Sequence, residues 1–217
     1  PPGVSIFGWS VPVHAAHEPD DDEASAVLSA VEALSAGVTT VIGLLGTDDV
    51  ARGPRELLAT VHALREEGLN AWALAGGYHL PAATMTGSLR GDLVFLEPYL
   101  GVGELAISDH RSSQPTLDEL LRVASDAHVA GLMTGRAGIV HLHLGDGERG
   151  LDLVHRALDS SELPARVFNP THVNRRRALF ASEARRIGRP LVSCQLVGGN
   201  DDVLFDGRSR VFDAEGR

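Results

Sequence analysis

Apolar and polar positions alternate along the chain in two repeating patterns. Segments with apolar residues at helical spacing are separated by short, nearly continuous apolar runs, which are typical of strands covered on both faces. The segments with helical spacing are 23–36, 54–67, 116 to about 128, 151–158 and 176–186. The strand-like runs are 38–45, 70–75, the run that contains Glu104, 139–143, 166–168 and 191–197. This strict alternation predicts parallel strands joined by right-handed crossovers, in a barrel or in a doubly wound sheet.

A few residues mark where the predicted elements begin and end. Thr116 and Glu119 have the spacing of a capping box, which starts a helix and leaves residues 108–114 as a loop. Neither pattern extends into residues 1–22 or 198–217, so we expect both ends of the chain to be irregular.

The composition of the chain argues against several classes of binding partner. A net charge of −10 and a pI near 5.4 argue against nucleic acid, because a protein that binds phosphates needs a basic surface. No apolar run approaches the roughly 20 residues of a membrane helix, and no glycine fingerprint for nucleotides follows a strand. Cys194 is the single cysteine and no signal-like segment opens the chain, so we expect a cytoplasmic location.

Polar side chains collect where three of the strand-like runs end. Glu104 lies in one run, His143 in the next, and His172 follows the third. The three stretches are GVGELAISDHR (101–111), GIVHLHLGD (138–146) and VFNPTHVNR (167–175). The carboxyl ends of the strands meet at one face of a barrel, so we expect these side chains to lie close together. Glutamate and histidine are ligands of first-row metals, and the pattern therefore predicts a metal site.

Each of these residues also has an ordinary structural explanation when taken alone. A buried carboxylate is often simply paired with a nearby cation, here Arg111. A buried neutral histidine such as His143 or His172 needs only one hydrogen bond to be satisfied. The recurrence at the same end of successive strands favours the metal site over these alternatives.

Two arginines follow the same strand ends. Arg111 and Arg175 offer guanidinium forks that bind carboxylates, which indicates a substrate with one or two carboxylate groups. The alternative is that they pair with local acids such as Asp109 and Asp146. Tyr78 could polarise a carbonyl group, or could cap the apolar surface of its loop.

Five motifs of this chain resemble those of the isoaspartyl (β-aspartyl) dipeptidases of the amidohydrolase superfamily. They are AGVTTVIGLLGTD (36–48), GGYHLP with TGS (76–88), GVGELAISDHRSSQPT (101–116), HLHLGDG (141–147) and PTHVNR (170–175). The resemblance implies a metal-dependent TIM-type (β/α)8 barrel that hydrolyses dipeptides linked through the β-carboxyl of aspartate. Residues 1–217 would form a single, partial barrel domain of this kind.

The resemblance also implies which residues hold metal. His143 and His172 match ligands of a zinc ion, and Glu104 stands where many members carry a carboxylated lysine that bridges two metals. Asp206 lies in a shortened form of the family's SSDGNGS segment, where it would be the last metal ligand and the proton acceptor. We therefore expect one or two zinc ions.

The remaining roles concern the substrate. Tyr78 resembles the tyrosine that polarises the scissile carbonyl, and Thr47, Arg111, Arg175 and Ser209 resemble residues that hold the substrate. In the implied mechanism a metal-bound hydroxide attacks the isopeptide carbonyl, and its proton passes to the departing amine. The expected partner is a small acidic dipeptide, and we expect a homo-oligomer.

The chain also departs from the family pattern. The family's first strand ends in an HxH pair, whereas here Pro2 and Gly3 are followed by Gly8-Trp9-Ser10. The interval from His172 to Asp206 is too short for a further strand and crossover. We therefore expect an incomplete barrel with exposed strand edges. The alternative function is a catalytically dead amidohydrolase-like remnant that binds one metal or an acidic metabolite.

Overall fold

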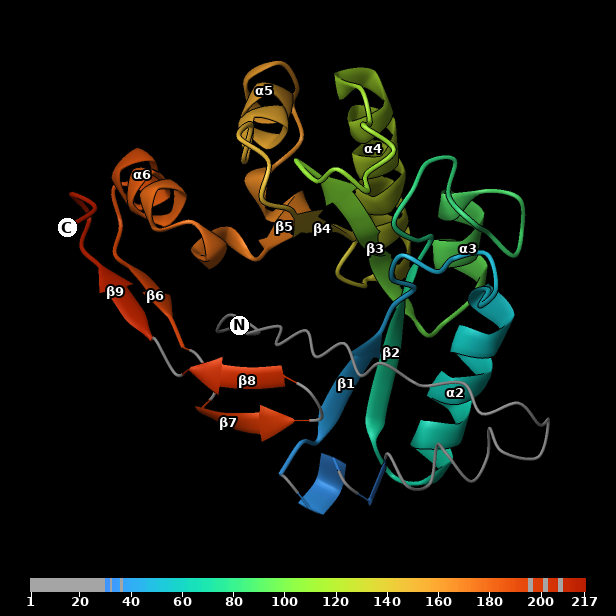
Figure 1. Ribbon diagram of the computed structural model, residues 1–217. Helices are drawn as coiled ribbons and strands as arrows, with labels where there is room; N and C mark the ends of the chain where they lie inside the picture. Colours follow the sequence, from blue (N-terminus) through green and yellow to red (C-terminus); the bar gives the residue numbers. More distant parts are fainter. Residues whose placement is uncertain (1–29, 32, 36, 195–196, 201–202, 207–208) are drawn as a thin grey trace.

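A parallel sheet of five strands forms the centre of the protein (Figure 1). The computed structural model describes residues 30–31, 33–35, 37–194, 197–200, 203–206 and 209–217. The strands are β1 (Thr40–Gly43), β2 (Asn70–Ala75), β3 (Tyr99–Ile107), β4 (Ile139–Leu144) and β5 (Phe168–Thr171). They lie in the order β1-β2-β3-β4-β5, and each pairs in parallel with the next.

This strand order decides between the two folds that the sequence left open. A doubly wound sheet reverses its order at a switch point, whereas a barrel adds each new strand on the same side. The observed order runs in one direction only. The sheet is therefore a half-barrel, which confirms the prediction of an incomplete TIM-type barrel.

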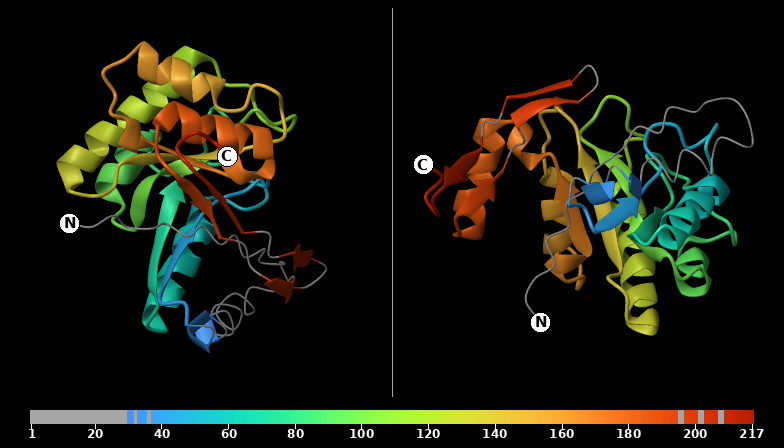
Figure 2. Two further views of the ribbon diagram at one scale, coloured as in Figure 1. Left: turned by 90° about the vertical axis from the view of Figure 1, so that its left-hand side faces the viewer. Right: turned by 90° about the horizontal axis from the view of Figure 1, so that it is seen from below.

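The helices from α2 to α5 connect the strands and cover the outer face of the curved sheet, whereas α6 follows β5 and packs against β9 (Arg210–Phe212) (Figures 1 and 2). The helices are α2 (Pro54–Glu66), α3 (Leu89–Phe95), α4 (Leu117–Thr134), α5 (Asp152–Asp159) and α6 (Arg177–Ile187), with short 3-10 turns η1 (Ala165–Val167) and η2 (Val173–Arg175). Among the described helices, none is both long and apolar enough to cross a membrane.

Alternation along β4 shows how the sequence divides the two faces of the sheet. Val140, Leu142 and Leu144 are buried in the main hydrophobic cluster with residues of α4 and α5. His141 and His143 occupy the positions between them, and successive side chains of a strand point to opposite faces. The apolar side chains of β4 thus pack against the helices, and its histidines face the inside of the half-barrel.

Glycines in β3 allow that strand to lie against β4. Gly101 pairs with Ile139, and a β-carbon at Gly101 would collide with the backbone oxygen of Ile139. Gly103 has a φ of 152°, and a β-carbon there would lie 2.7 Å from the backbone oxygen of His141. The two glycines of the GVG motif are therefore needed for close packing of β3 against β4, and this packing places Glu104 beside β4.

Most predicted elements agree with the structure, but α3 is an exception. β2 has the predicted bounds, and α4 begins with the predicted capping box: Glu119 N donates to Thr116 Oγ1 at 3.3 Å, and Thr116 N donates to Glu119 Oε2 at 2.8 Å. The helix continues to Gly135, which adopts the left-handed conformation. Sequence analysis missed α3 because its apolar positions are too few to show a period.

The C-terminal region differs from the prediction. β6 (Leu191–Ser193) is shorter than the expected strand 191–197 and pairs antiparallel with β9 (Arg210–Phe212). β7 (Val197–Asn200) pairs antiparallel with β8 (Val203–Asp206), so residues 198–217 contain short strands where we expected irregular chain. Both pairs are held by cross-strand pairing, and the β6–β9 pair also packs against α6 through Leu191 and Phe212; local sequence reveals neither. Residues 1–22 lie outside the described part of the chain.

A smaller difference concerns the strand predicted at 166–168. Residues 165–167 form η1 instead, and β5 begins at Phe168. Val167 and Phe168 are both buried, so the apolar run marks the core without marking the strand boundary.

Leu142 provides a test of the core between β4 and its covering helices. Because its side chain is fully buried, Leu142→Ala should lower the free energy of unfolding by about 2–5 kcal/mol through lost burial and a residual cavity. Leu132→Ala is the matched control, since Leu132 is 68% exposed on α4. Urea denaturation followed by circular dichroism measures both. Equal effects at the two positions would contradict this packing.

Candidate metal centre

The carboxyl ends of neighbouring strands bring the three predicted metal ligands together. Glu104 lies near the end of β3, His143 near the end of β4, and His172 directly after β5. One ligand atom from each side chain lies within 4.8 Å of the others. Glu104 and His143 are buried and His172 is half-buried. The predicted proximity of the three residues is therefore confirmed.

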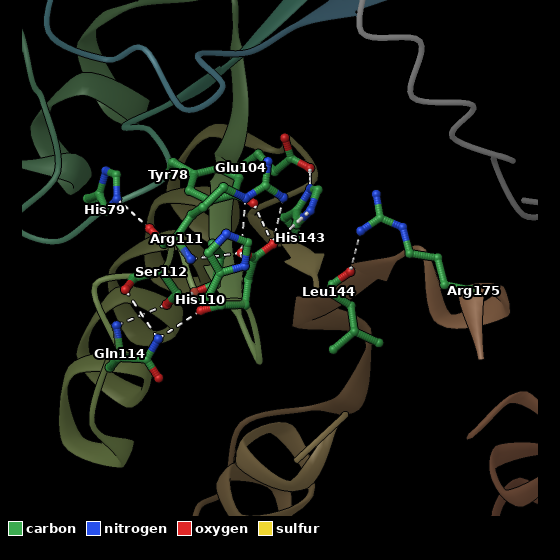
Figure 3. A network of polar contacts seen from close by, with 12 residues as sticks. Tyr78, His79, Glu104, His110, Arg111, Ser112, Gln114, His143, Leu144 and Arg175 are labelled. Atoms are coloured by element: carbon green, nitrogen blue, oxygen red, sulfur yellow. Dashed lines mark hydrogen bonds and ion pairs between the residues drawn. The ribbon is translucent and has the colours of Figure 1, made fainter. Parts of the chain in front are cut away.

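The shortest contact in this cluster joins Glu104 and His143 (Figure 3). Oε1 of Glu104 lies 2.5 Å from Nδ1 of His143. Burial raises the pKa of Glu104, but the hydrogen bond from His143 and the neighbouring histidines outweigh it, so the pKa lies below its usual value. Glu104 is thus an anion that is ready to bind a cation.

The other ring nitrogen of His143 has no hydrogen-bond partner among the described residues. Its Nε2 is buried, and the nearest acidic oxygen is Oδ2 of Asp109 at 3.5 Å. A buried polar atom without a partner is costly, and such atoms often mark a place for an ion or ligand. The orphaned nitrogen therefore fits the metal site that the sequence predicts.

His172 completes the cluster at the start of η2. Its ring lies 4.6 Å from the ring of His143 between centroids. Burial lowers the pKa of His172 to about 4, assisted by the positive charge of Arg175. At neutral pH the imidazole is uncharged, which is the form that binds metal.

The donor set as a whole fits a divalent cation. Two imidazoles and one carboxylate are a common first coordination shell for zinc and other first-row metals. The residues therefore form a candidate metal centre, and the fit rests on the cluster itself and on the orphaned nitrogen of His143.

Tyr78 is placed beside this centre by the loop after β2. Its ring is buried, and its centroid lies 5.1 Å from that of His143. The hydroxyl donates a hydrogen bond of 3.0 Å to Oδ2 of Asp109. Burial raises the pKa of Tyr78, and the bond to Asp109 raises it further, so the phenol keeps its proton at neutral pH. It is a hydrogen-bond donor at the edge of the metal centre.

Arg111 is held by Asp109, as the alternative reading of the sequence allowed. Its Nε donates to Oδ1 at 3.0 Å, and Nη2 donates to Oδ2 at 2.7 Å. These bonds hold the pKa of Asp109 well below its usual range. The guanidinium is partly exposed, and Nη1 takes no part in this pair.

Arg175 lies on the other side of His143 from Arg111 in the view of Figure 3. Its Nη1 donates to the backbone oxygen of Leu144 at 3.4 Å, and the side chain is exposed. The described residues show no ion pair between Arg175 and Asp146. The exposed guanidinium next to His172 could therefore meet a substrate carboxylate.

For the other three predicted site residues, the structure gives a position in the chain but, in its described part, no contact with the metal cluster. Thr47 is exposed in the loop after β1, at the same edge of the sheet. Ser209 is exposed between β8 and β9. Asp206 is the last residue of β8, and its side chain lies outside the described part of the chain. The roles of these three residues stay predictions.

Asp109 is a site residue that sequence analysis did not single out. It was considered only as a local partner for Arg111, although it also bonds Tyr78 and faces His143. The sequence DHR at 109–111 indicates that Asp109 could pair with Arg111. It does not indicate the bond to Tyr78, because that bond joins two separate loops. His141 has a structural partner, since its Nδ1 lies 2.9 Å from Oδ1 of Asn169.

A cavity of about 320 Å³ lies elsewhere, between the loop after β3 and the start of α5. It is lined by Ile107, Ser108, Ser112, Gln114, Pro115, Thr116, Leu117, Arg149, Gly150, Asp152, Leu153 and Arg156. None of the three cluster residues borders it, and Asp152 is the only His, Cys, Asp or Glu residue in its lining. We place the chemistry at the cluster for this reason.

The chain is similar to solved structures of known proteins. No family model matches the chain. Two similar solved structures are of β-aspartyl dipeptidase from the thermophilic keratin-degrading Fervidobacterium islandicum AW-1. One has a TM-score of 0.71 and 44% identity over 74% of this chain and 44% of that one. The other, in complex with β-Asp-Leu, has a TM-score of 0.68 and 46% identity over 70% and 42%.

The fold and the site define the class first: a half-barrel of the amidohydrolase type with a candidate metal centre at the carboxyl ends of its strands. Within that class, the chain belongs to the family of β-aspartyl dipeptidases, and the resemblance seen in its motifs is confirmed. The chain spans less than half the length of the two structures that it matches.

Removal of one imidazole tests the metal centre. His172→Ala should weaken the binding of Zn²⁺, used as a probe, by about 100-fold or more, because one of three ligands is lost. Isothermal titration calorimetry on metal-free protein measures this affinity. His62→Ala is the control, since His62 is exposed on α2 away from the cluster. Full affinity in His172→Ala would contradict the site.

The lowered pKa of His172 predicts a specific dependence of stability on pH in metal-free protein. Between the unfolded value of 6.5 and the folded value of about 4, the unfolded chain binds more protons, so stability falls as the pH is lowered through this range. His172→Gln should remove up to about 3 kcal/mol of that fall. Urea denaturation from pH 7 to pH 4, with a chelator present, checks it. An identical decline in the variant and the wild type would refute the assignment.

Proposed function

We propose that this protein hydrolyses β-aspartyl dipeptides in a zinc-dependent reaction. The observation that carries the proposal is the cluster of Glu104, His143 and His172 at the carboxyl edge of a half-barrel. One of the related structures is a complex with β-Asp-Leu, which supports this class of substrate.

Three residues would hold the metal: Glu104, His143 and His172. Their two nitrogens and one carboxylate favour zinc among the metals that bind such sets. A bound zinc ion supplies a Lewis acid and lowers the pKa of water, so that a nucleophile exists at neutral pH. The wider prediction adds Asp206 as a further ligand and as the acceptor of a proton, with one or two ions in total.

Tyr78 would act on the carbonyl oxygen of the scissile bond. The phenol carries one proton, which it donates to Asp109 in the described structure. Bound substrate would compete for that proton, and the hydroxyl would turn from Oδ2 of Asp109 towards the carbonyl oxygen. Donation at that point stabilises negative charge as it develops on the oxygen.

Two guanidinium groups would hold the carboxylates of the substrate. A β-aspartyl dipeptide carries the α-carboxylate of its aspartate and its C-terminal carboxylate. Arg175 is exposed beside His172, and Arg111 keeps Nη1 outside its pair with Asp109. Such forks select carboxylates by geometry as well as charge. Thr47 and Ser209 would add hydrogen bonds from their loops.

Two general properties accompany this proposal. A single cysteine, Cys194, is in keeping with a reducing cytoplasmic location. A homo-oligomeric assembly also remains a proposal, founded on the family resemblance.

The decisive experiment combines metal analysis with turnover of β-Asp-Leu. We expect hydrolysis of β-Asp-Leu but not of α-Asp-Leu, and one or two equivalents of zinc in the purified protein. Glu104→Gln should lower kcat/KM by about 100-fold or more, because it removes an anionic ligand. Glu66→Gln, an exposed acid at the end of α2, is the matched control.

The opposite result would favour the other function named above. Protein that binds at most one metal ion and leaves β-Asp-Leu intact would be a remnant that has kept a metal or metabolite site without catalysis. Equal turnover in the wild type and Glu104→Gln would instead show that the reaction does not use this centre.

A further inference from the structure

Asp109 is the point at which the polar contacts of the site converge. It follows β3 by two residues, and it is buried. Its two carboxylate oxygens accept four hydrogen bonds: from the backbone N, Nε and Nη2 of Arg111 and from the hydroxyl of Tyr78, at 2.7 to 3.0 Å. A single carboxylate therefore fixes two side chains that come from different loops.

Packing fixes the position of Asp109 itself. Its backbone oxygen accepts hydrogen bonds from Ser112 N at 3.1 Å and from Nε2 of Gln114 at 2.8 Å. Gly145, just after β4, lies against Asp109 so closely that a β-carbon there would collide with it. The backbone and β-carbon of Asp109 are thus held between the loops that follow two neighbouring strands.

The same contacts exclude Asp109 as a metal ligand in this arrangement. A carboxylate has about four lone-pair positions, and all four are occupied by donors of the protein. Its nearest approach to the cluster is the 3.5 Å separation between Oδ2 and Nε2 of His143. It is also a poor proton acceptor, because Arg111 holds its pKa well below the usual range.

We propose that Asp109 is a positioning residue for substrate: it holds the guanidinium of Arg111 beside the pair Glu104–His143, and it holds the phenol of Tyr78 there until the substrate takes the proton of that hydroxyl. The inference rests on the proposed function, because that function assigns substrate contacts to Tyr78 and Arg111. Arg111 then presents Nη1 in a fixed direction, and Tyr78 presents its hydroxyl next to the ring of His143. Such preorganisation improves both binding and turnover.

The first test uses two substitutions at this position. Asp109→Asn keeps the shape of the side chain but offers donors to Arg111 and Tyr78. Asp109→Glu keeps the charge but displaces it by one methylene group. Both should lower kcat for β-Asp-Leu by about 10-fold to 100-fold. Asp118→Asn, an exposed acid on α4, should keep wild-type kcat. Wild-type kcat in Asp109→Glu would show that charge alone is required and would overturn the proposal.

A double-mutant cycle separates positioning from a purely structural role. If Asp109 acts through Tyr78, Asp109→Asn should change kcat by less than about threefold in a Tyr78→Phe background. A structural role predicts the same fold loss in both backgrounds, and that result would refute positioning. Circular dichroism and zinc content are measured on every variant, so that loss of folding or metal is recognised.

A binding experiment keeps this inference distinct from the proposed function. β-Asp-Leu is titrated by calorimetry into metal-free protein, where no turnover occurs. Asp109→Asn and Asp109→Glu should each weaken its affinity by about 10-fold, through misplacement of Arg111. If metal-free wild-type protein binds the dipeptide but the zinc-loaded protein does not hydrolyse it, the proposed function is refuted and this test stays intact. Unchanged affinity in both variants, or no binding by the wild type, would overturn the positioning role.

Discussion

Parallel pairing of strands in unbroken order is the constraint on which the site depends. Because β1 to β5 run in the same direction, each strand ends at the same edge of the sheet. Residues that are 39 positions apart in the chain, Glu104 and His143, thereby come within 2.5 Å of each other. The helices on the outer face secure this register, since the apolar set of each strand must face them. The site residues occupy the strand positions that do not face the helices.

Burial of charge determines how the polar residues at this edge are arranged. A carboxylate that leaves water must gain a partner, and the two acids of the site have different ones. Glu104 is paired with His143 and remains directed towards the cluster, whereas Asp109 is saturated by Arg111 and Tyr78. One acid is therefore suited to bind a cation, and the other to hold neighbouring side chains. This division of roles follows from the donors around each carboxylate.

Much of the fold and of the metal cluster could be read from the sequence. Alternation along 139–144 separates Leu142, which faces the helices, from His143, which faces inward, and the capping box at Thr116 fixes where α4 begins. α3 was missed because a helix so short has no clear period, and β9 was missed because its partner β6 is distant in the chain. Asp109 was undervalued because its bond to Tyr78 joins two separate loops.

The sequence by itself determined the alternation of strands and helices, the candidate ligands Glu104, His143 and His172, and the family. These properties are local patterns, or motifs whose spacing survives in the linear chain. Only the tertiary structure decided between a barrel and a doubly wound sheet, since both have the same local periodicity. It also decided which partner each charged group takes. By its position in the sequence, Arg111 could bind substrate or a local acid. Only the packing of two loops around Asp109 shows that this acid takes Nε and Nη2 and leaves Nη1 outside the pair.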